Sequence, residues 1–282
     1  MMSMFNLHCH SNYCDGSSPL REYADAAVFG GFHTLGFSSH APLPFKNKFA
    51  LRDEQALLNY AAEISRLKEE FQSRLNIYTA LEIDYIPGIS DDFDHLRKLA
   101  NLDYVIGGVH LVRNGDQEQL WFIDGPRQEI YVEGLQQIFG GDARKAVTRY
   151  WQQMREMITT QKPDIVAHLD KIKMHNQNRF FSTTDKWYVE QVEQTLEVIA
   201  AQDTIVEVNT RGLYKGRSDE LFPGEGILTR MLELNIPVTV NSDSHRPEEI
   251  DGFYPQAYDT LRRIGFRQVM CFTDKGWEGR EF

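Results

Sequence analysis

Residues 4–10 read Met-Phe-Asn-Leu-His-Cys-His, a short apolar run that ends in two histidines. Side chains two positions apart on a β-strand point to the same face, so His8 and His10 can bind one ion together. Further short apolar runs also carry a histidine or a carboxylate at or just past their ends. The nine residues placed in this way are His8, His10, Asp15, His40, Glu82, His110, His168, Asp243 and His245. Because metal sites are built from these side-chain types, the series predicts one polynuclear metal site formed by many strands.

Strand and helix patterns alternate along the whole chain. Strands are expected at 4–10, 34–38, 77–83, 104–109, 165–167, 204–208, 237–240 and 268–272, and helices at 20–29, 53–72, 91–100, 142–160, 185–201, 226–234 and 255–264. This alternation predicts an α/β protein with parallel strands and right-handed crossovers. A barrel of seven or eight such units is favoured over an open sheet, because only a barrel brings all the strand ends to one face where the nine side chains can meet.

The composition is that of an ordinary globular protein. A chain of 282 residues with 41% hydrophobic residues can form one large domain, so we expect residues 1–282 to be a single domain. The formal net charge of −11 argues against a nucleic-acid partner, because backbone binding needs clustered Lys and Arg. No apolar stretch is long enough to span a bilayer, residues 1–6 lack a signal-peptide pattern, and three cysteines cannot all pair with each other. We therefore expect a cytoplasmic protein.

Several residues keep two interpretations at this stage. Asp15 stands in Asp15-Gly16-Ser17, which could equally be a turn, and Glu207 could make a structural hydrogen bond or take part in catalysis. His175 could lie on the rim of a pocket. Cys9 should point away from the face that His8 and His10 share, and both Cys9 and Cys14 are interpreted as packing residues.

Residues 111–141 form a long connection whose aromatic residues suggest that it folds over the site. Connections at this end of a barrel commonly form part of the substrate pocket. Three acidic residues of this segment could bind a substrate amine: Asp116, Glu118 and Asp124.

Several motifs of the chain resemble those of a known family. They are His8-Cys9-His10-Ser11-Asn12-Tyr13-Cys14-Asp15-Gly16, Ser38-Ser39-His40-Ala41-Pro42, Glu82, Gly107-Gly108-Val109-His110, Ala167-His168 and Asn241-Ser242-Asp243-Ser244-His245. Together they are similar to the motifs of the polymerase and histidinol phosphatase (PHP) superfamily, and most similar to those of its monofunctional histidinol-phosphate phosphatases. The resemblance implies a distorted seven-stranded (β/α) barrel, with two to three divalent ions (zinc, manganese or iron) at the carboxyl ends of the strands.

The resemblance also implies a role for each candidate residue. The first ion would be held by His8, His10, Glu82 and Asp243, the second by Glu82, His110 and His168, and the third by Asp15, His40 and His245. Glu82, Asp243 and His245 are the expected catalytic residues, and Arg211 and Lys215 are candidates to bind the phosphate of a small-molecule ester.

The implied reaction is hydrolysis of L-histidinol phosphate to L-histidinol and phosphate in histidine biosynthesis. A hydroxide that bridges two metal ions would attack phosphorus in line. Two alternatives stay open. The chain could be a PHP enzyme that acts on a phosphodiester, a nucleotide or a broad range of phosphate esters, or it could be a binding module whose metal site is structural. The sequence leaves the oligomeric state open.

Overall fold

The computed structural model describes residues 4–115 and 117–282, so Asp116 lies outside the described residues. Seven parallel strands form one sheet, in the order β1 (Met4–Asn6), β2 (Phe32–Phe37), β3 (Asn76–Asp84), β4 (Tyr104–Gly108), β7 (Ile165–Val166), β8 (Ile205–Asn209) and β9 (Val238–Asn241). The first and last strands meet just beyond their ends, where Cys9 and Ser244 form a parallel bridge and the His10 amide donates to the Ser244 carbonyl at 2.9 Å. The sheet is therefore a nearly closed barrel, which confirms the predicted fold class.

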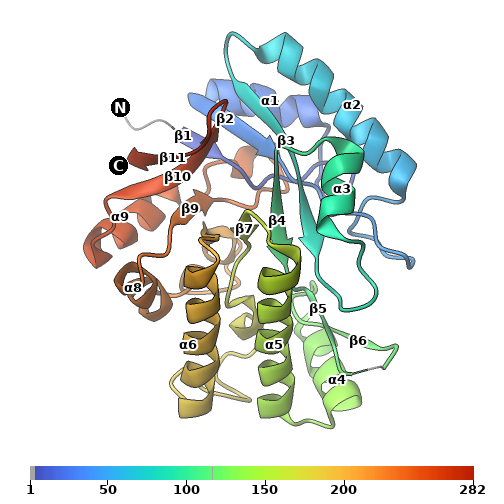
Figure 1. Ribbon diagram of the computed structural model, residues 1–282, viewed down its shortest axis with the longest axis vertical. Coiled ribbons are helices and arrows are strands. Elements are labelled where there is room, and N and C mark those ends of the chain that lie inside the picture. The colour runs from blue at the N-terminus through green and yellow to red at the C-terminus, as the bar shows by residue number, and fades with distance from the viewer. Residues whose placement is uncertain (1–3, 116) are drawn as a thin grey trace.

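Helices surround the barrel and connect its strands (Figure 1). They are α1 (Leu20–Phe29), α2 (Glu54–Phe71), α3 (Phe93–Ala100), α4 (Gln128–Phe139), α5 (Ala143–Gln161), α6 (Lys186–Ala201), α7 (Arg211–Tyr214), α8 (Glu225–Glu233) and α9 (Tyr254–Ile264). Aspartates begin several of them. Asp53 accepts a hydrogen bond from the Ala56 amide at 2.8 Å, and Asp142 caps α5 through the Lys145 amide at 2.9 Å. Such caps satisfy amides that have no partner inside the helix, which explains why these helices begin where the sequence predicts.

The strand expected at 268–272 exists but is not part of the barrel. It is β10 (Gln268–Thr273), which pairs antiparallel with β11 (Gly276–Glu281) in a separate hairpin. Phe272 and Trp277 of this hairpin pack against Tyr104 of β4, with ring centroids 5.5 and 5.7 Å from the tyrosine ring. The hairpin therefore covers one end of the barrel instead of adding an eighth strand.

The connection at 111–141 contains a hairpin and a helix that the sequence did not predict. The hairpin consists of β5 (Leu111–Arg113) and β6 (Leu120–Phe122), and α4 follows it. Trp121 is fully buried and packs against Tyr131 and Phe139 of α4. This small aromatic core holds β6 in place beside the carboxyl end of β4.

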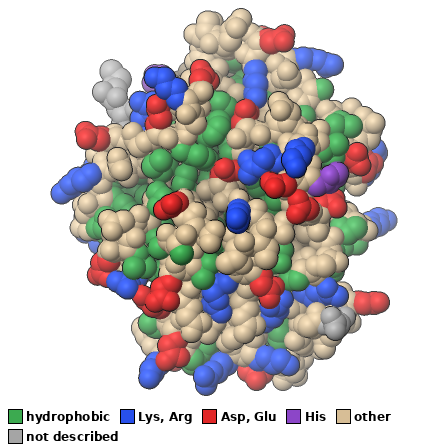
Figure 2. All heavy atoms as spheres, in the orientation of Figure 1, with side chains coloured by type: hydrophobic (Ala, Val, Ile, Leu, Met, Phe, Trp, Pro, Cys, Tyr) green, Lys and Arg blue, Asp and Glu red, His purple; other side chains and the backbone are tan. Residues whose placement is uncertain are grey.

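On the face drawn in Figure 2, basic and acidic side chains lie intermixed. None of the helices in the described ranges is both long and apolar enough to cross a bilayer.

Candidate metal centre

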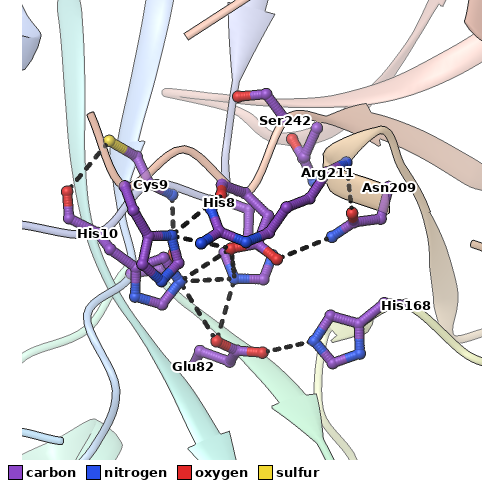
Figure 3. Close-up of polar contacts among 12 residues, drawn as sticks. His8, Cys9, His10, Glu82, His168, Asn209, Arg211 and Ser242 are labelled. Carbon is purple, nitrogen blue, oxygen red and sulfur yellow. Dashed lines mark hydrogen bonds and ion pairs between the residues drawn. The ribbon is translucent and has the colours of Figure 1, made fainter. Parts of the chain in front are cut away.

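The nine predicted side chains come from six barrel strands or the loops that follow them, and the structure brings them together at one end of the barrel. Glu82, near the end of β3, lies in the middle of the cluster. In Figure 3 one of its carboxylate oxygens faces His168 and the other faces the side of His8 and His10. The Cβ of any residue larger than glycine at position 108 would lie 3.3 Å from Glu82 Oε1 and from His110 Cε1. Gly108 therefore leaves room for these side chains to converge.

The first group of potential ligands contains His8, His10 and Asp243. The Nε2 atoms of His8 and His10 are 3.2 Å apart, and His10 Nε2 is 3.2 Å from Asp243 Oδ1. Glu82 Oε2 lies 3.2 Å from His8 Nε2, so it can join this group. These are the four residues expected to hold a first ion.

The second group lies on the other side of Glu82. Glu82 Oε1 is 2.9 Å from His168 Nε2 and 3.4 Å from His110 Nε2, and the two histidine nitrogens are 3.1 Å apart. A single carboxylate therefore faces two groups of histidines with its two oxygens, which is the geometry of a bridging ligand.

The third group contains His10, Asp15, His40 and His245. Asp15 Oδ1 lies 3.2 Å from His245 Nε2 and 4.0 Å from His40 Nε2. Asp15 also belongs to a tight turn, because a Cβ at Gly16 would lie 2.5 Å from the Ser11 amide nitrogen. The two interpretations of Asp15 are therefore compatible, since the turn aims its carboxylate at the histidines.

The spacing and chemistry of these groups fit divalent cations. Two ligand atoms bound to one ion at about 2.1 Å in tetrahedral geometry are about 3.4 Å apart, close to the distances within the first two groups. Two buried atoms in the cluster, His40 Nδ1 and Asp243 Oδ1, have no hydrogen-bond partner among the described residues. Imidazole and carboxylate ligands suit zinc, manganese and iron alike. The residues can therefore hold two to three divalent ions.

Partners outside the cluster orient the histidines. His8 Nδ1 donates to Glu207 Oε1 at 2.6 Å, and His110 Nδ1 donates to Asp84 Oδ1 at 2.8 Å. Each bond leaves Nε2 free to face the cluster, as carboxylate partners of metal-binding histidines do. Asp84 was missed in the sequence, although it lies two positions after Glu82 on β3 and so shares its strand face.

The two N-terminal cysteines, Cys9 and Cys14, have different surroundings. Cys9 is fully buried in the hydrophobic core, as expected. Cys14 is partly buried, and its Sγ lies 3.4 Å from His10 Nδ1, a contact that the sequence did not predict. His175 contacts the Gly125 carbonyl at 2.8 Å and does not line the cavity beside the metal groups, so its role is structural.

Charge interactions set the protonation of the cluster. Burial opposes ionisation of Glu82, but the surrounding histidines, His8 and His40 first, hold its pKa well below the usual range. Burial lowers the pKa of His40 to about 4 and that of His245 to about 3. The carboxylate is therefore ionised and these two histidines are neutral near pH 7, which is the state that binds metal.

A cavity of about 500 Å³ opens beside the cluster. Its walls carry ligand candidates from all three groups together with basic and aromatic side chains. The lining residues are Asp15, His40, Asn47, Lys48, Phe49, Glu82, His110, Phe122, Asp124, Gly125, Pro126, Lys171, Arg211, Arg217, Asp243 and His245. The connection at 111–141 contributes Phe122 and Asp124, so part of it forms the pocket as its aromatic content suggested.

The two predicted phosphate-binding residues have different positions. Arg211 lines the cavity and donates from Nη1 to the Asp243 carbonyl at 2.7 Å. Lys215 forms an ion pair with Glu249 and is not among the residues that line the cavity, so its role in phosphate binding stays a prediction. Lys171, which the sequence analysis missed, lies there instead. Its Nζ is 2.9 Å from Asp124 Oδ2 and 3.9 Å from Asp243 Oδ2, and its side chain is 10% exposed.

Residues 6–211 match the PHP domain family, which is more than half of the chain. The chain belongs to the PHP domain family. Within this family, a protein of Deinococcus radiodurans named "Probable histidinol-phosphatase" is 29% identical over 272 residues, covering 95% of this chain and 96% of its own. The histidinol-phosphatase of Bacillus subtilis is 26% identical over 262 residues, covering 88% of this chain and 95% of its own.

A solved structure shares the PHP fold of this chain. It is the histidinol phosphate phosphatase of Lactococcus lactis in complex with zinc, L-histidinol and phosphate. The two structures align with a TM-score of 0.71 and 20% identity, over 99% of this chain and 100% of the other. The likeness supports the barrel architecture from end to end.

Proposed function

We propose that this PHP protein is a metal-dependent phosphomonoesterase that hydrolyses L-histidinol phosphate to L-histidinol and phosphate. The observation that carries the proposal is the position of Arg211 and Lys171 on the wall of one cavity with all three groups of potential metal ligands. Relatives that align over nearly their whole length are histidinol-phosphatases, which supports the same substrate.

The expected ligand sets are part of this proposal. His8, His10, Glu82 and Asp243 would hold one ion, Glu82, His110 and His168 a second, and Asp15, His40 and His245 a third. Divalent ions bound there supply a nucleophile from water near neutral pH and positive charge for the phosphoryl oxygens. Zinc fits this donor set, and so do manganese and iron.

The remaining residues bind and orient the phosphate. The Arg211 guanidinium is planar and can donate two parallel hydrogen bonds to phosphate oxygens. It is held by the Asp243 carbonyl and lies 3.9 Å from Glu249, so its position is fixed before substrate binds. The Lys171 ammonium adds a second positive charge in the cavity. Preorganised charges of this kind stabilise the charge that the transition state carries on the phosphoryl group.

The test is phosphate release from L-histidinol phosphate by protein loaded with zinc or manganese, compared with sugar phosphates, nucleotides and a phosphodiester. We expect a strong preference for L-histidinol phosphate that is lost when the ions are chelated. Preferential cleavage of the diester or of another monoester would contradict the proposed substrate but would agree with the proposed metal centre. Equal activity before and after complete metal removal would contradict the metal centre itself.

A further inference from the structure

We propose that Asp124 forms a subsite for the ammonium group of the substrate and so makes the enzyme selective for esters of amino alcohols. This inference rests on the proposed function, because it assigns a role within the same cavity. It names the chemical feature that the enzyme would recognise besides the phosphate.

The charges on the cavity wall point to this residue. Four carboxylates line the cavity: Asp15, Glu82, Asp124 and Asp243. Three of them belong to the groups that can hold metal ions, and Asp124 does not. Among the described lining residues, Asp124 is therefore the carboxylate left to bind a cationic group of a ligand.

The surroundings of Asp124 leave it capacity for a second cation. Its Oδ2 accepts a hydrogen bond from Lys171 Nζ at 2.9 Å. Its Oδ1 is buried and has no hydrogen-bond partner among the described residues. A carboxylate has about four acceptor positions, so one lysine does not saturate it. A buried acceptor without a partner is costly, and an ammonium donor from a ligand would satisfy it.

The position of Asp124 matches the shape of the substrate. Its Oδ2 is 3.8 Å from His110 Nε2, and His110 belongs to the second group of potential metal ligands. Lys171 lies between Asp124 and Asp243, at the side of the cavity where the phosphate would bind. In L-histidinol phosphate the ammonium is carried by the carbon next to the ester carbon. A phosphate held by the ions, Arg211 and Lys171 would therefore bring the ammonium close to Asp124.

Two substrates and two variants test the inference. L-histidinol phosphate is compared with its analogue that lacks the amine, 3-(imidazol-4-yl)propyl phosphate, for the wild type, Asp124→Asn and Glu118→Gln. Glu118, the other described acid that the sequence analysis considered for the amine, is exposed and does not line the cavity, so it serves as the matched control. The readout is the ratio of kcat/KM for the two substrates. This ratio does not depend on the folded or metal-loaded fraction of a preparation, because both substrates are measured on the same sample.

We expect the wild type and Glu118→Gln to prefer the amine substrate, and Asp124→Asn to reduce that preference about tenfold or more, as loss of a hydrogen bond between charged groups should. A fall by the same factor for both substrates would overturn the inference, because it would mean that Asp124 acts only by positioning Lys171. A wild type that does not discriminate between the two would also overturn it. Hydrolysis of neither phosphate by the metal-loaded wild type would instead contradict the proposed function, and the inference with it.

Discussion

His8 Nδ1 donates a hydrogen bond to Glu207 Oε1 at 2.6 Å, and both side chains are fully buried. The same carboxylate accepts from the His168 amide at 3.1 Å and from Asn209 Nδ2 at 2.9 Å. Glu207 therefore orients one potential metal ligand through its ring and another through its backbone. The sequence left open whether this residue is structural or catalytic, and the structure shows it as a hydrogen-bond partner of two potential metal ligands.

Glu207→Gln should weaken metal binding. The amide keeps the volume of the side chain but offers only an uncharged acceptor oxygen, so His8 keeps a weaker partner for its Nδ1. Loss of such partners typically lowers metal affinity by about 10 to 100-fold. Competition between the protein and a chromophoric chelator measures the change. Glu197→Gln, at an exposed position of α6, is the control and should bind metal as the wild type does. Unchanged affinity in Glu207→Gln would refute the positioning role.

Lys171→Met should reduce kcat/KM for L-histidinol phosphate, because it removes a positive charge from the cavity wall while keeping much of the side-chain length. A hydrogen bond to a charged group contributes about 1.5 to 3 kcal/mol, so we expect a loss of about 10 to 100-fold. Steady-state phosphate release measures it, with thermal unfolding as a check because Asp124 loses its partner. Lys98→Met, exposed on α3, should retain full activity. A kcat/KM for Lys171→Met close to that of the wild type would exclude a phosphate contact.

Metal binding should release protons near pH 7.5. Burial alone would lower the pKa of both His8 and His110, but Glu207 beside His8 and Asp84 beside His110 outweigh it and raise the pKa values to about 10 and about 9. Both rings are therefore protonated without metal and must lose a proton to bind it, so affinity should increase as the pH rises toward about 9.

The same shifts stabilise the metal-free fold, because both histidines bind protons more tightly in the folded chain than in the unfolded one. This contribution is fully present below the unfolded pKa of 6.5 and is lost as the pH rises through about 9 to 10. The protons that metal binding releases are counted by calorimetric titration of metal-free protein with zinc in two buffers of different ionisation enthalpy. Identical binding enthalpies in the two buffers would contradict the predicted proton release.

Gly36→Ala should destabilise the barrel. The new Cβ would lie 1.7 Å from Tyr104 Oη and 3.1 Å from Leu7 Cα, so the Tyr104 side chain must move from its hydrogen bond to the Leu7 carbonyl. Overpacking of this kind costs about 1 to 3 kcal/mol in the free energy of unfolding, measured by urea denaturation. Gly226→Ala is the matched control, since no neighbouring atom lies within 4 Å and alanine favours the helix by about 0.5 to 1 kcal/mol. Equal stability of Gly36→Ala and the wild type would contradict the prediction.

The ligand candidates could be found in the sequence because parallel strands bring their carboxyl ends to one place. His110 follows β4 and His168 follows β7, each after one further residue, so residue type and position along the chain were sufficient. Cys14 could not be assigned in this way. Its contact with His10 depends on the turn of the loop after His10, which returns the chain toward the ring.

Lys171, the second side chain proposed to bind phosphate, was harder to predict because it does not stand at the end of a strand. Lys171 begins a short 3-10 helix, Lys171–Lys173, and His168 before it adopts a φ of +25° that redirects the chain. Lys215 looked equally suitable, but Glu249, distant in sequence, binds it. The final strand shows a similar limit. The β pattern of residues 268–272 is the same for a barrel strand and for a hairpin, and only pairing with residues 276–281 distinguishes them.

The most direct test of the metal-bridging account is turnover of L-histidinol phosphate by Glu82→Gln, with the bound metal counted in the same preparation. Glutamine keeps the shape of the side chain but cannot offer two anionic oxygens to the two groups of histidines that Glu82 faces. We predict that the wild type loaded with zinc or manganese hydrolyses the substrate and that Glu82→Gln is nearly inactive. Near-normal activity of Glu82→Gln with a normal metal content would contradict the central claim.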